Sequence, residues 1–247
     1  MTSSVDIDEV AKFEAMAKSW WDPNGKFKPL HKMNPVRLGY IIEQITWHYD
    51  RDMKASKSLD GLSVIDVGCG GGLLCEPLTR VGAKVTGVDA APTNIEVASL
   101  HAKSAELEID YQNRLAEDLV AEGQKFDVVL AMEIVEHVAD PAEFVKSLQA
   151  LLKPDGILIM STLNRNTKSY LAAIIAAEHV LKWLPKGTHD WHKFIKPDEL
   201  ADMIEEAKMT VKDRRGMVLN PISQKWSLSH RDLSVNYAIC AVNPTEV

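Results

Sequence analysis

The sequence predicts an α/β fold with a doubly wound, mostly parallel sheet, and three observations support this. Between residues 62 and 161, short apolar runs alternate with segments of helical periodicity. The fourth run, Phe126–Ala131, is apolar apart from Asp127, which is typical of parallel strands that helices cover on both faces. The first run, Leu62–Val67, leads into four glycines within five positions, Gly68, Gly70, Gly71 and Gly72. Such a turn lets a ligand approach the backbone at the carboxyl end of a strand.

The N-terminal part of the chain predicts two helices. Asp6 and Asp8 can cap the first helix. Its apolar face carries Val10, Phe13, Ala17, Trp20 and Trp21. That face either packs on the core or forms a lid beside a substrate pocket. A second helix is expected to begin at Asn34-Pro35, after a loop from Phe27 to Met33.

The remaining elements follow in a regular order. Apolar runs predict strands at Leu62–Val67, Ala83–Val88, Ile109–Gln112, Phe126–Ala131, Ile157–Ser161, Met209–Asp213 and Tyr237–Val242. Helical patterns are expected at Leu73–Val81, Pro92–Glu106, Pro141–Leu152 and Pro197–Glu206. The alternation is interrupted between Thr162 and Pro197, which indicates an insertion after the fifth strand.

Composition narrows the classes of function. The chain has 247 residues, enough for one α/β domain with additions, and its 46% hydrophobic residues allow a sizeable core. A net charge of -7 argues against a nucleic-acid partner held on a basic face. Cys69, Cys75 and Cys240 show neither metal-ligand spacing nor a disulfide framework, as expected in a reducing cytoplasm. Met1–Glu9 lacks the features of a signal peptide, and no apolar run of about 20 residues could span a membrane.

Acidic residues frame the glycine-rich turn. Asp66 precedes it, and Asp89 ends the next strand roughly 20 residues on, where an acid meets ribose hydroxyls in nucleotide-binding units. A dinucleotide site would need a third glycine where this chain has Leu73, and no phosphate-binding P-loop is present. A carboxylate at Asp66 suits a cationic amino group better than a pyrophosphate. The pattern resembles class I S-adenosylmethionine (SAM)-dependent methyltransferases, which implies SAM contacts at Asp66, Gly68, Gly70 and Asp89.

Two further positions are candidates for cofactor contacts. Arg37 is expected in the first turn of the second helix, where a cation opposes the helix dipole. That cost suggests a task such as a bidentate hold on a carboxylate, and a surface arginine is the alternative. After the third strand, the resemblance implies an acid that accepts a hydrogen bond from the adenine amino group. Asp118 is the candidate, Glu117 is the alternative, and a plain surface charge is a third interpretation.

An acidic segment directly follows the fourth strand: Met132-Glu133-Ile134-Val135-Glu136-His137. If it is helical, Glu133, Glu136 and His137 share one face at the carboxyl end of the sheet. Two carboxylates and an imidazole suit a divalent metal ion or general-base catalysis. The alternative is a solvated helix start whose acids are well placed for the helix dipole.

Longer stretches resemble one family within this superfamily. Five of them are similar to the O-methyltransferases of ubiquinone biosynthesis: Asn34–Tyr40, Asp66–Gly72, Glu133–Val138, Ser161–Asn166 and Pro185–Asp190. The match extends from about Asp6 to Ala241. It implies a Rossmann-like, seven-stranded sheet with an antiparallel final strand, N-terminal helices and a helical insertion after the fifth strand.

The same resemblance implies the reaction and its ligands. It implies two O-methylations, one on a polyprenylated, catechol-type hydroxyphenol and one on demethylubiquinol, with SAM as donor and S-adenosylhomocysteine as product. The residues implied for SAM are Arg37, Gly68, Asp89 and Met132. The residues implied for a divalent cation, with magnesium as the expected ion, are Glu133, Glu136 and His137. Such a cation would stabilise the phenolate, because a free phenol has a pKa of about 10. His189 is a candidate auxiliary base, with a structural role as the alternative.

The insertion from Asn164 to Asp190 combines apolar side chains with lysines. Its apolar residues are Tyr170, Leu171, Ile174, Ile175, Val180, Leu181, Trp183 and Leu184, and its lysines are Lys168, Lys182 and Lys186. The segment is too short and too charged to span a bilayer, but it can lie in a membrane interface. We expect residues 165–187 to dock on anionic lipid and to cover the site, and a lid packed on its own core is the alternative. This places the protein in the cytoplasm at the inner face of the membrane, with other enzymes of the pathway as candidate partners.

The chain is therefore expected to form one methyltransferase domain. Its parts are an N-terminal helical cap (1–60), a nucleotide-binding core (61–162), the helical insertion (163–196), and a C-terminal helix with strands (197–247). Three other functions stay open. The first is a methyltransferase of the same fold that acts on a soluble catechol or another phenol. The second is a non-enzymatic module that binds SAM or another nucleoside, against which the acidic segment argues. The third is an NAD-dependent oxidoreductase, against which Leu73 argues.

Overall fold

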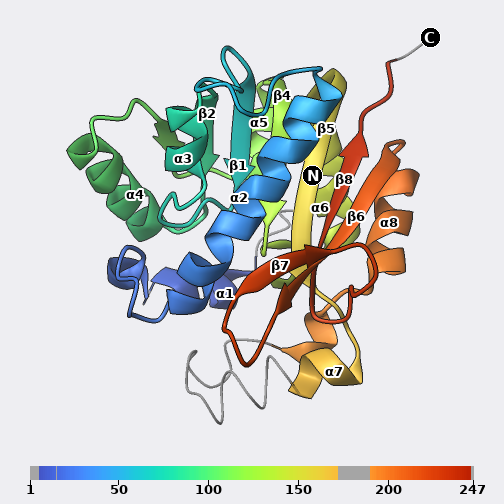
Figure 1. The fold of residues 1–247 in the computed structure, drawn as a ribbon. Helices are drawn as coiled ribbons and strands as arrows, with labels where there is room; N and C mark the ends of the chain where they lie inside the picture. Colours follow the sequence, from blue (N-terminus) through green and yellow to red (C-terminus); the bar gives the residue numbers. More distant parts are fainter. Residues whose placement is uncertain (1–5, 15, 172–189, 246–247) are drawn as a thin grey trace.

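One sheet of eight strands runs through the described residues, which are 6–14, 16–171 and 190–245 of a computed structural model (Figure 1). The strand order is β3-β2-β1-β4-β5-β8-β6-β7. The bounds are β1 Ser63–Val67, β2 Lys84–Val88, β3 Asp110–Gln112, β4 Phe126–Met132, β5 Leu152–Leu163, β6 Thr210–Leu219, β7 Trp226–Ser229 and β8 Asn236–Val242. Strands β1 to β5 pair in parallel, whereas β8 is antiparallel to β5 and β6, and β7 is antiparallel to β6. The doubly wound, mostly parallel sheet is confirmed, with one strand more than the seven expected.

The additional strand is β7, at the edge of the sheet. It pairs only with β6, and its Trp226 lies opposite Leu219. A segment of only four residues in which apolar and polar side chains alternate is hard to tell from a loop in the sequence. Strand β6 also extends past the predicted end at Asp213 to Leu219, which provides the ladder that β7 joins.

Helices cover both faces of the sheet. Their bounds are α1 Ile7–Glu14, α2 Lys28–His48, α3 Cys75–Arg80, α4 Pro92–Ser104, α5 Ala116–Ala121, α6 Pro141–Ala150, α7 Thr167–Ser169 and α8 Pro197–Glu206. Helices α5, α6 and α8 contribute side chains to one hydrophobic cluster, and α2 and α3 contribute to the other. Figure 1 shows α2 running along the face of the sheet. No helix in the described part of the chain is long and apolar enough to cross a membrane.

Helix α2 begins earlier than predicted. The expected loop from Phe27 to Met33 was wrong, because the helix starts at Lys28 with Pro29 in its first turn and carries Pro35 inside it. A proline in a helix interior removes one backbone hydrogen bond, which made Pro35 look like a helix start. Here the buried Met33, Tyr40 and neighbouring apolar side chains pack on the sheet and hold the helix together through this position.

The N-terminal segment is fastened to the glycine-rich turn. Helix α1 ends at Glu14, so the two tryptophans follow the helix rather than extending its face. The Trp20 indole N–H donates to Asn94 Oδ1 (2.8 Å), and the Trp21 indole N–H donates to the Gly71 carbonyl (2.9 Å). Trp20 also stacks on Phe27, with ring centroids 3.7 Å apart. Trp20 is therefore both packed in a small core and placed beside the site described next.

Candidate functional site

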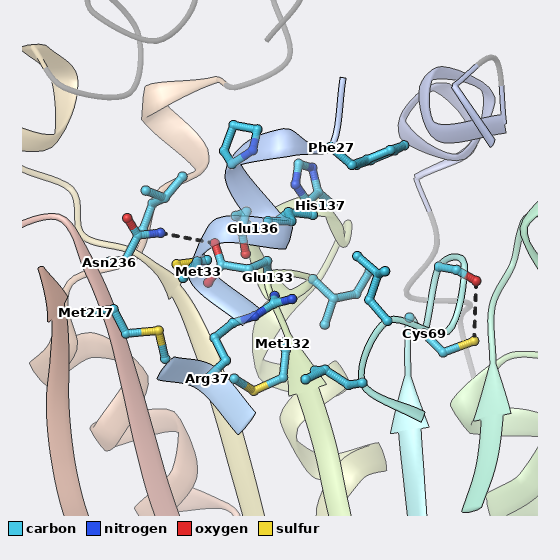
Figure 2. A pocket seen from close by; sticks show the side chains of 18 of the residues that line it. Phe27, Met33, Arg37, Cys69, Met132, Glu133, Glu136, His137, Met217 and Asn236 are labelled. Carbon is cyan, nitrogen blue, oxygen red and sulfur yellow. Dashed lines mark hydrogen bonds between the residues drawn. The ribbon is translucent and has the colours of Figure 1, made fainter. Parts of the chain in front are cut away.

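A cavity of about 890 Å³ lies beyond the carboxyl ends of β1, β2 and β4. Asp66, Asp89 and Met132, from the ends of these three strands, line it together. The chain order of the sheet reverses beside β1, and crevices at this point are where ligands bind to open α/β sheets. The volume is in the range of small-molecule sites. Figure 2 shows side chains that line the cavity, among them Arg37, Cys69 and Met132.

Asp89 fixes the conformation of the glycine-rich turn through a hydrogen bond to its backbone. Its Oδ2 accepts the Gly70 N–H (2.9 Å), and its Oδ1 accepts the Ala91 N–H (2.8 Å) and the Asn94 amide (3.1 Å). Gly70 has φ +53, and a Cβ atom there would overlap the ring of Trp20. Glycine is therefore needed for both conformation and space. Burial raises the pKa of Asp89, although these hydrogen bonds lower it.

Asp66 lies deeper, at the inner end of the cavity. It is buried, and its Oδ2 accepts a hydrogen bond from the Cys75 thiol (3.4 Å). Burial raises the pKa of Asp66 to about 7, while the Cys75 thiol and the charge of Arg37 lower it. A carboxylate in this state gains most from a ligand that brings a positive charge, because such a charge restores the ionised form.

Arg37 is a buried cavity residue, so the surface-arginine interpretation was wrong. Its place in a first turn was also wrong, because α2 starts at Lys28. Its Nη2 donates to Asn34 Oδ1 (2.9 Å), and its Nε is buried with no hydrogen-bond partner among the described residues. Burial lowers the pKa of Arg37, while the charges of Glu133 and Asp66 raise it. A buried guanidinium with an unused donor fits the carboxylate that the sequence analysis assigned to it.

The acidic segment after β4 is not an α-helix, so the prediction of one helical face was wrong. Glu133 has φ +57, in the left-handed region, and a 3-10 turn follows at Val135–His137. Glu133, Glu136 and His137 nevertheless all line the cavity, as Figure 2 shows. A left-handed residue followed by a 3-10 turn, rather than an α-helix, thus brings these three side chains to the cavity.

Strand β5 and strand β8 anchor the two carboxylates. Glu133 accepts hydrogen bonds from the Ser161 hydroxyl (2.7 Å) and the Asn236 amide (3.3 Å). Glu136 accepts one from the Thr162 hydroxyl (2.7 Å), and its side chain is buried. Ser161, Thr162 and Asn236 were not predicted as site residues. The place of Ser161 and Thr162 at the carboxyl end of a parallel strand was a usable signal for them.

His137 is paired with Glu9 of helix α1. Their Nδ1 and Oε2 atoms are 2.9 Å apart, and both side chains are 8% exposed. Burial lowers the pKa of His137, but the Glu9 hydrogen bond and the charges of Glu136, Glu9 and Glu133 outweigh it and raise that pKa. The same bond holds the pKa of Glu9 well below its usual range. Lys193, which donates to Glu9 Oε1 (3.2 Å) and Asp6 Oδ2 (2.9 Å), completes the cluster. Nothing local in the sequence marks Glu9 as a site residue.

Replacing Glu9 with Gln should lower the pKa of His137 and create a pH-dependent loss of stability. The pKa of His137 is raised above 6.5, so its stabilisation is complete below pH 6.5 and is lost as pH rises through the native value. The pKa of Glu9 is lowered below 4.5, so its stabilisation is present above pH 4.5 and is lost in acid. The Tm gap between wild type and E9Q should be widest between pH 4.5 and 6.5.

Thermal unfolding across pH, with chelator present, measures this gap, and NMR titration of the imidazole measures the pKa. Glu14→Gln is the matched control, because Glu14 is on the same helix but accepts from the Thr93 hydroxyl. A gap that stays constant up to alkaline pH would show that the pair does not titrate as described.

The donor set at this end of the cavity has the chemistry of a divalent-metal site. Two carboxylates and an imidazole offer oxygen and nitrogen ligands. Within the described ranges, however, no group of three or more His, Cys, Asp or Glu side chains is arranged to hold a metal ion. Glu9 engages Nδ1 of His137, and Thr162 engages Glu136. The assignment of a divalent metal ion to Glu133, Glu136 and His137 therefore stays a prediction.

Two other predicted residues lie apart from this cavity or outside the described chain. Asp118 is in the first turn of α5, where its Oδ2 accepts the Leu115 N–H (3.1 Å). Neither Asp118 nor Glu117 lines the cavity, so the adenine contact stays a prediction. His189 and most of the expected lipid-docking segment 165–187, namely residues 172–187, lie outside the described residues.

Comparisons with known proteins agree with this geometry. A family model described as a methyltransferase domain matches residues 47–212. The chain is 60% identical over 243 residues to a ubiquinone biosynthesis O-methyltransferase of Cereibacter sphaeroides, covering 98% of each chain. It is 59% identical over 243 residues to the protein of the same description from Dinoroseobacter shibae, again covering 98% of each.

Solved structures share the fold. A magnesium protoporphyrin IX methyltransferase from Synechocystis with bound SAM has a TM-score of 0.59 at 17% identity, covering 98% of this chain and 100% of that one. A possible histamine N-methyltransferase from Thermotoga maritima has a TM-score of 0.64 at 16% identity, covering 95% of this chain and 99% of that one. The family model and the curated relatives confirm the predicted enzyme class, a methyltransferase. Because the identity to curated relatives is high along almost the whole chain, this protein belongs to the ubiquinone biosynthesis O-methyltransferase family.

Proposed function

We propose that this chain transfers the methyl group of SAM to phenolic hydroxyls of ubiquinone precursors, namely a polyprenyl hydroxyphenol and demethylubiquinol. The names of the relatives support the pathway. The observation that carries the proposal is the joint lining of one cavity. The acids at the ends of β1 and β2, Asp66 and Asp89, share it with Glu133, Glu136 and His137. A nucleoside end and an acidic-imidazole end in one cavity are what a methyl transfer to a phenol requires.

The nucleoside end offers a complementary group for each part of SAM. The buried Arg37 guanidinium would hold the methionyl carboxylate. Asp66 would accept from the amino group, Asp89 would receive the ribose hydroxyls, and Met132 would pack beside the cofactor. Asp118 remains the proposed partner of the adenine amino group. Cavity walls that exclude water once both ligands are bound would favour the reaction, because the sulfonium charge disappears as the methyl group moves.

The other end would receive the phenol and its proton. In a neutral His137 ring, the bond to Glu9 keeps the proton on Nδ1 and leaves Nε2 as the acceptor. The Glu9 carboxylate also makes that ring more basic. Alternatively, Nε2 of His137 would join Glu133 and Glu136 in holding a magnesium ion, which would supply Lewis-acid stabilisation of the phenolate. His189 remains a proposed auxiliary base.

The direct test is a SAM-dependent assay of the full chain with a short-chain demethylubiquinol and with a tail-less catechol, each with and without chelator. We expect methylation of the demethylubiquinol, a clear preference for the tailed substrate, and a loss of rate with chelator that magnesium restores. Equal turnover of both substrates would favour a methyltransferase of soluble phenols. No turnover of either would favour a binding module and reject the proposal.

The substrate tail places the reaction at a membrane, and we propose that residues 165–187 dock on its anionic inner face. In the described part of that segment, Tyr170 and Leu171 are exposed, at 42% and 52%. Exposed apolar side chains beside lysines such as Lys168 favour an interfacial position. Other enzymes that supply or consume the intermediates are proposed partners at the same surface.

Making Leu171, Ile175 and Trp183 polar should abolish flotation with vesicles rich in anionic lipid, because the apolar contribution to binding is removed. Co-flotation of wild type and the triple variant is the measurement. The exposed Leu100 of α4 provides a control, since L100Q changes one exposed leucine elsewhere. Equal flotation of wild type and triple variant would reject docking through this segment.

A further inference from the structure

An apolar arm extends from the cavity between helix α2 and the β6–β7 hairpin. Met33 of α2 and Met217 of β6 form its inner end and are almost completely buried, at 3% and 1% exposure. Leu30, Leu219 and Trp226 line its middle and are partly exposed. These five side chains carry no charge, and methionines adapt readily to irregular apolar ligands. The arm thus differs from the polar end of the same cavity.

The inner end of the arm adjoins the acidic-imidazole end. Met217 of β6 lies opposite Asn236 of β8 in the sheet register. The Asn236 amide donates to Glu133 Oε2 (3.3 Å). Figure 2 shows Met33 and Asn236 on one side of Glu133, with Met217 below Asn236. A ligand whose reacting group contacts Glu133 would therefore have the mouth of the arm directly beside it.

The outer end of the arm lies at the turn that joins β6 to β7, where Pro221 and Gln224 line the cavity. Asn220 organises this turn, because its Oδ1 accepts the N–H groups of Ile222 (2.9 Å) and Ser223 (3.0 Å). Lys32 of α2 donates to Gln224 Oε1 (2.9 Å), which bridges the two walls. Ile222 is 94% exposed at the tip. Exposure thus increases from the buried methionines to the β6–β7 turn.

We infer that this arm binds the isoprenoid tail of the substrate, with the aromatic ring at Glu133 and the tail leaving past the β6–β7 turn. The inference rests on the proposed function. An isoprenoid chain has no polar group to pair, so it gains from hydrocarbon and thioether walls and loses from polar ones. The edge strand β7 has a role in this arrangement, since Trp226 and its neighbours form the outer wall opposite α2.

The test measures selectivity, the ratio of kcat/KM for a short-chain demethylubiquinol to kcat/KM for its tail-less analogue. Leu219→Gln should lower this ratio roughly tenfold, because a polar group replaces an apolar contact to the tail. Leu219→Met should keep the ratio near that of wild type, because the wall stays apolar. Leu100→Gln, a leucine of α4 remote from the cavity lining, is the matched control and should also keep it.

A selectivity ratio of L219Q equal to that of wild type would overturn the inference. So would a wild type that methylates both substrates with equal kcat/KM, which would leave the methyltransferase function standing. An independent readout uses a demethylubiquinol with a photoreactive group on its tail and peptide mapping of the cross-links. Labels on residues 217–226 or on the first half of α2 support the inference, and labels confined to other segments overturn it. A wild type without turnover of either substrate rejects the proposed function instead.

Discussion

Replacing Glu136 with Gln is expected to reduce kcat/KM for phenol methylation by about 10²- to 10⁴-fold, the range typical for loss of a group that assists proton transfer. The substitution keeps the size of the side chain and an oxygen for the Thr162 hydroxyl, so the fold should be retained. What it removes is a buried negative charge that raises the pKa of His137 and is proposed to hold the metal ion. Steady-state kinetics with saturating SAM measure the loss.

Two controls separate this effect from a change in folding or cofactor binding. SAM affinity, measured by calorimetry, should stay near the wild-type value, because Glu136 lies at the acidic-imidazole end of the cavity and not at the nucleoside end. Glu143→Gln changes an acid of α6 that pairs with Lys146 and is 53% exposed, and it should leave the rate unchanged. An E136Q rate within a few-fold of wild type would show that Glu136 has no part in the chemistry.

Replacing Arg37 with Met should weaken SAM binding by roughly a hundredfold, since truncating one partner of a buried charge pair typically costs 2–5 kcal/mol, about tenfold for each 1.4 kcal/mol. Arg37 is 4% exposed, so water cannot readily replace its contact to the ligand, and its buried Nε has no partner among the described residues that would compete with the ligand. The pKa of Asp66, about 7, should rise as well, because the Arg37 charge lowers it. Calorimetric titration with SAM is the measurement.

The stability of the ligand-free protein distinguishes a binding role from a structural one. A buried guanidinium that is only partly paired contributes little to folding, so R37M should unfold near the wild-type Tm. Arg51→Met is the matched control, because Arg51 bonds the Asp60 carbonyl (2.8 Å) away from the cavity. Unchanged SAM affinity in R37M would refute the assignment, and a large loss of Tm would indicate a structural role.

The fold was largely predictable because its signals are local. Each parallel strand overlaps a predicted apolar run, although β5 begins at Leu152 rather than at the predicted Ile157. Helix α8 was predicted with its observed bounds, Pro197–Glu206. The errors occur where tertiary packing overrides a local preference. Pro35 is tolerated inside α2, and β7 is a strand only because β6 lies beside it.

Several residues that line the cavity were predicted from the sequence, but the contacts that hold them there were not. Asp66, Asp89, Met132 and the acidic segment lie at or just after the carboxyl ends of strands, so they converge on the same edge of the sheet. The conformation of Glu133 was missed, because a left-handed residue other than glycine has no clear mark in the sequence. Glu9 was missed as well, because its partner His137 is 128 positions away.

The sequence alone determined the positions of the parallel strands along the chain, the glycine-rich turn, and the acids Asp66 and Asp89 beside it. These depend on the side-chain periodicity of neighbouring residues and on turn chemistry, both of which are local. The tertiary structure alone decided that Glu9 meets His137 and that Met217 lies beside Asn236 and Glu133. Such contacts join distant segments whose relative positions are set by the packing of helices on the sheet, and no local pattern encodes that geometry.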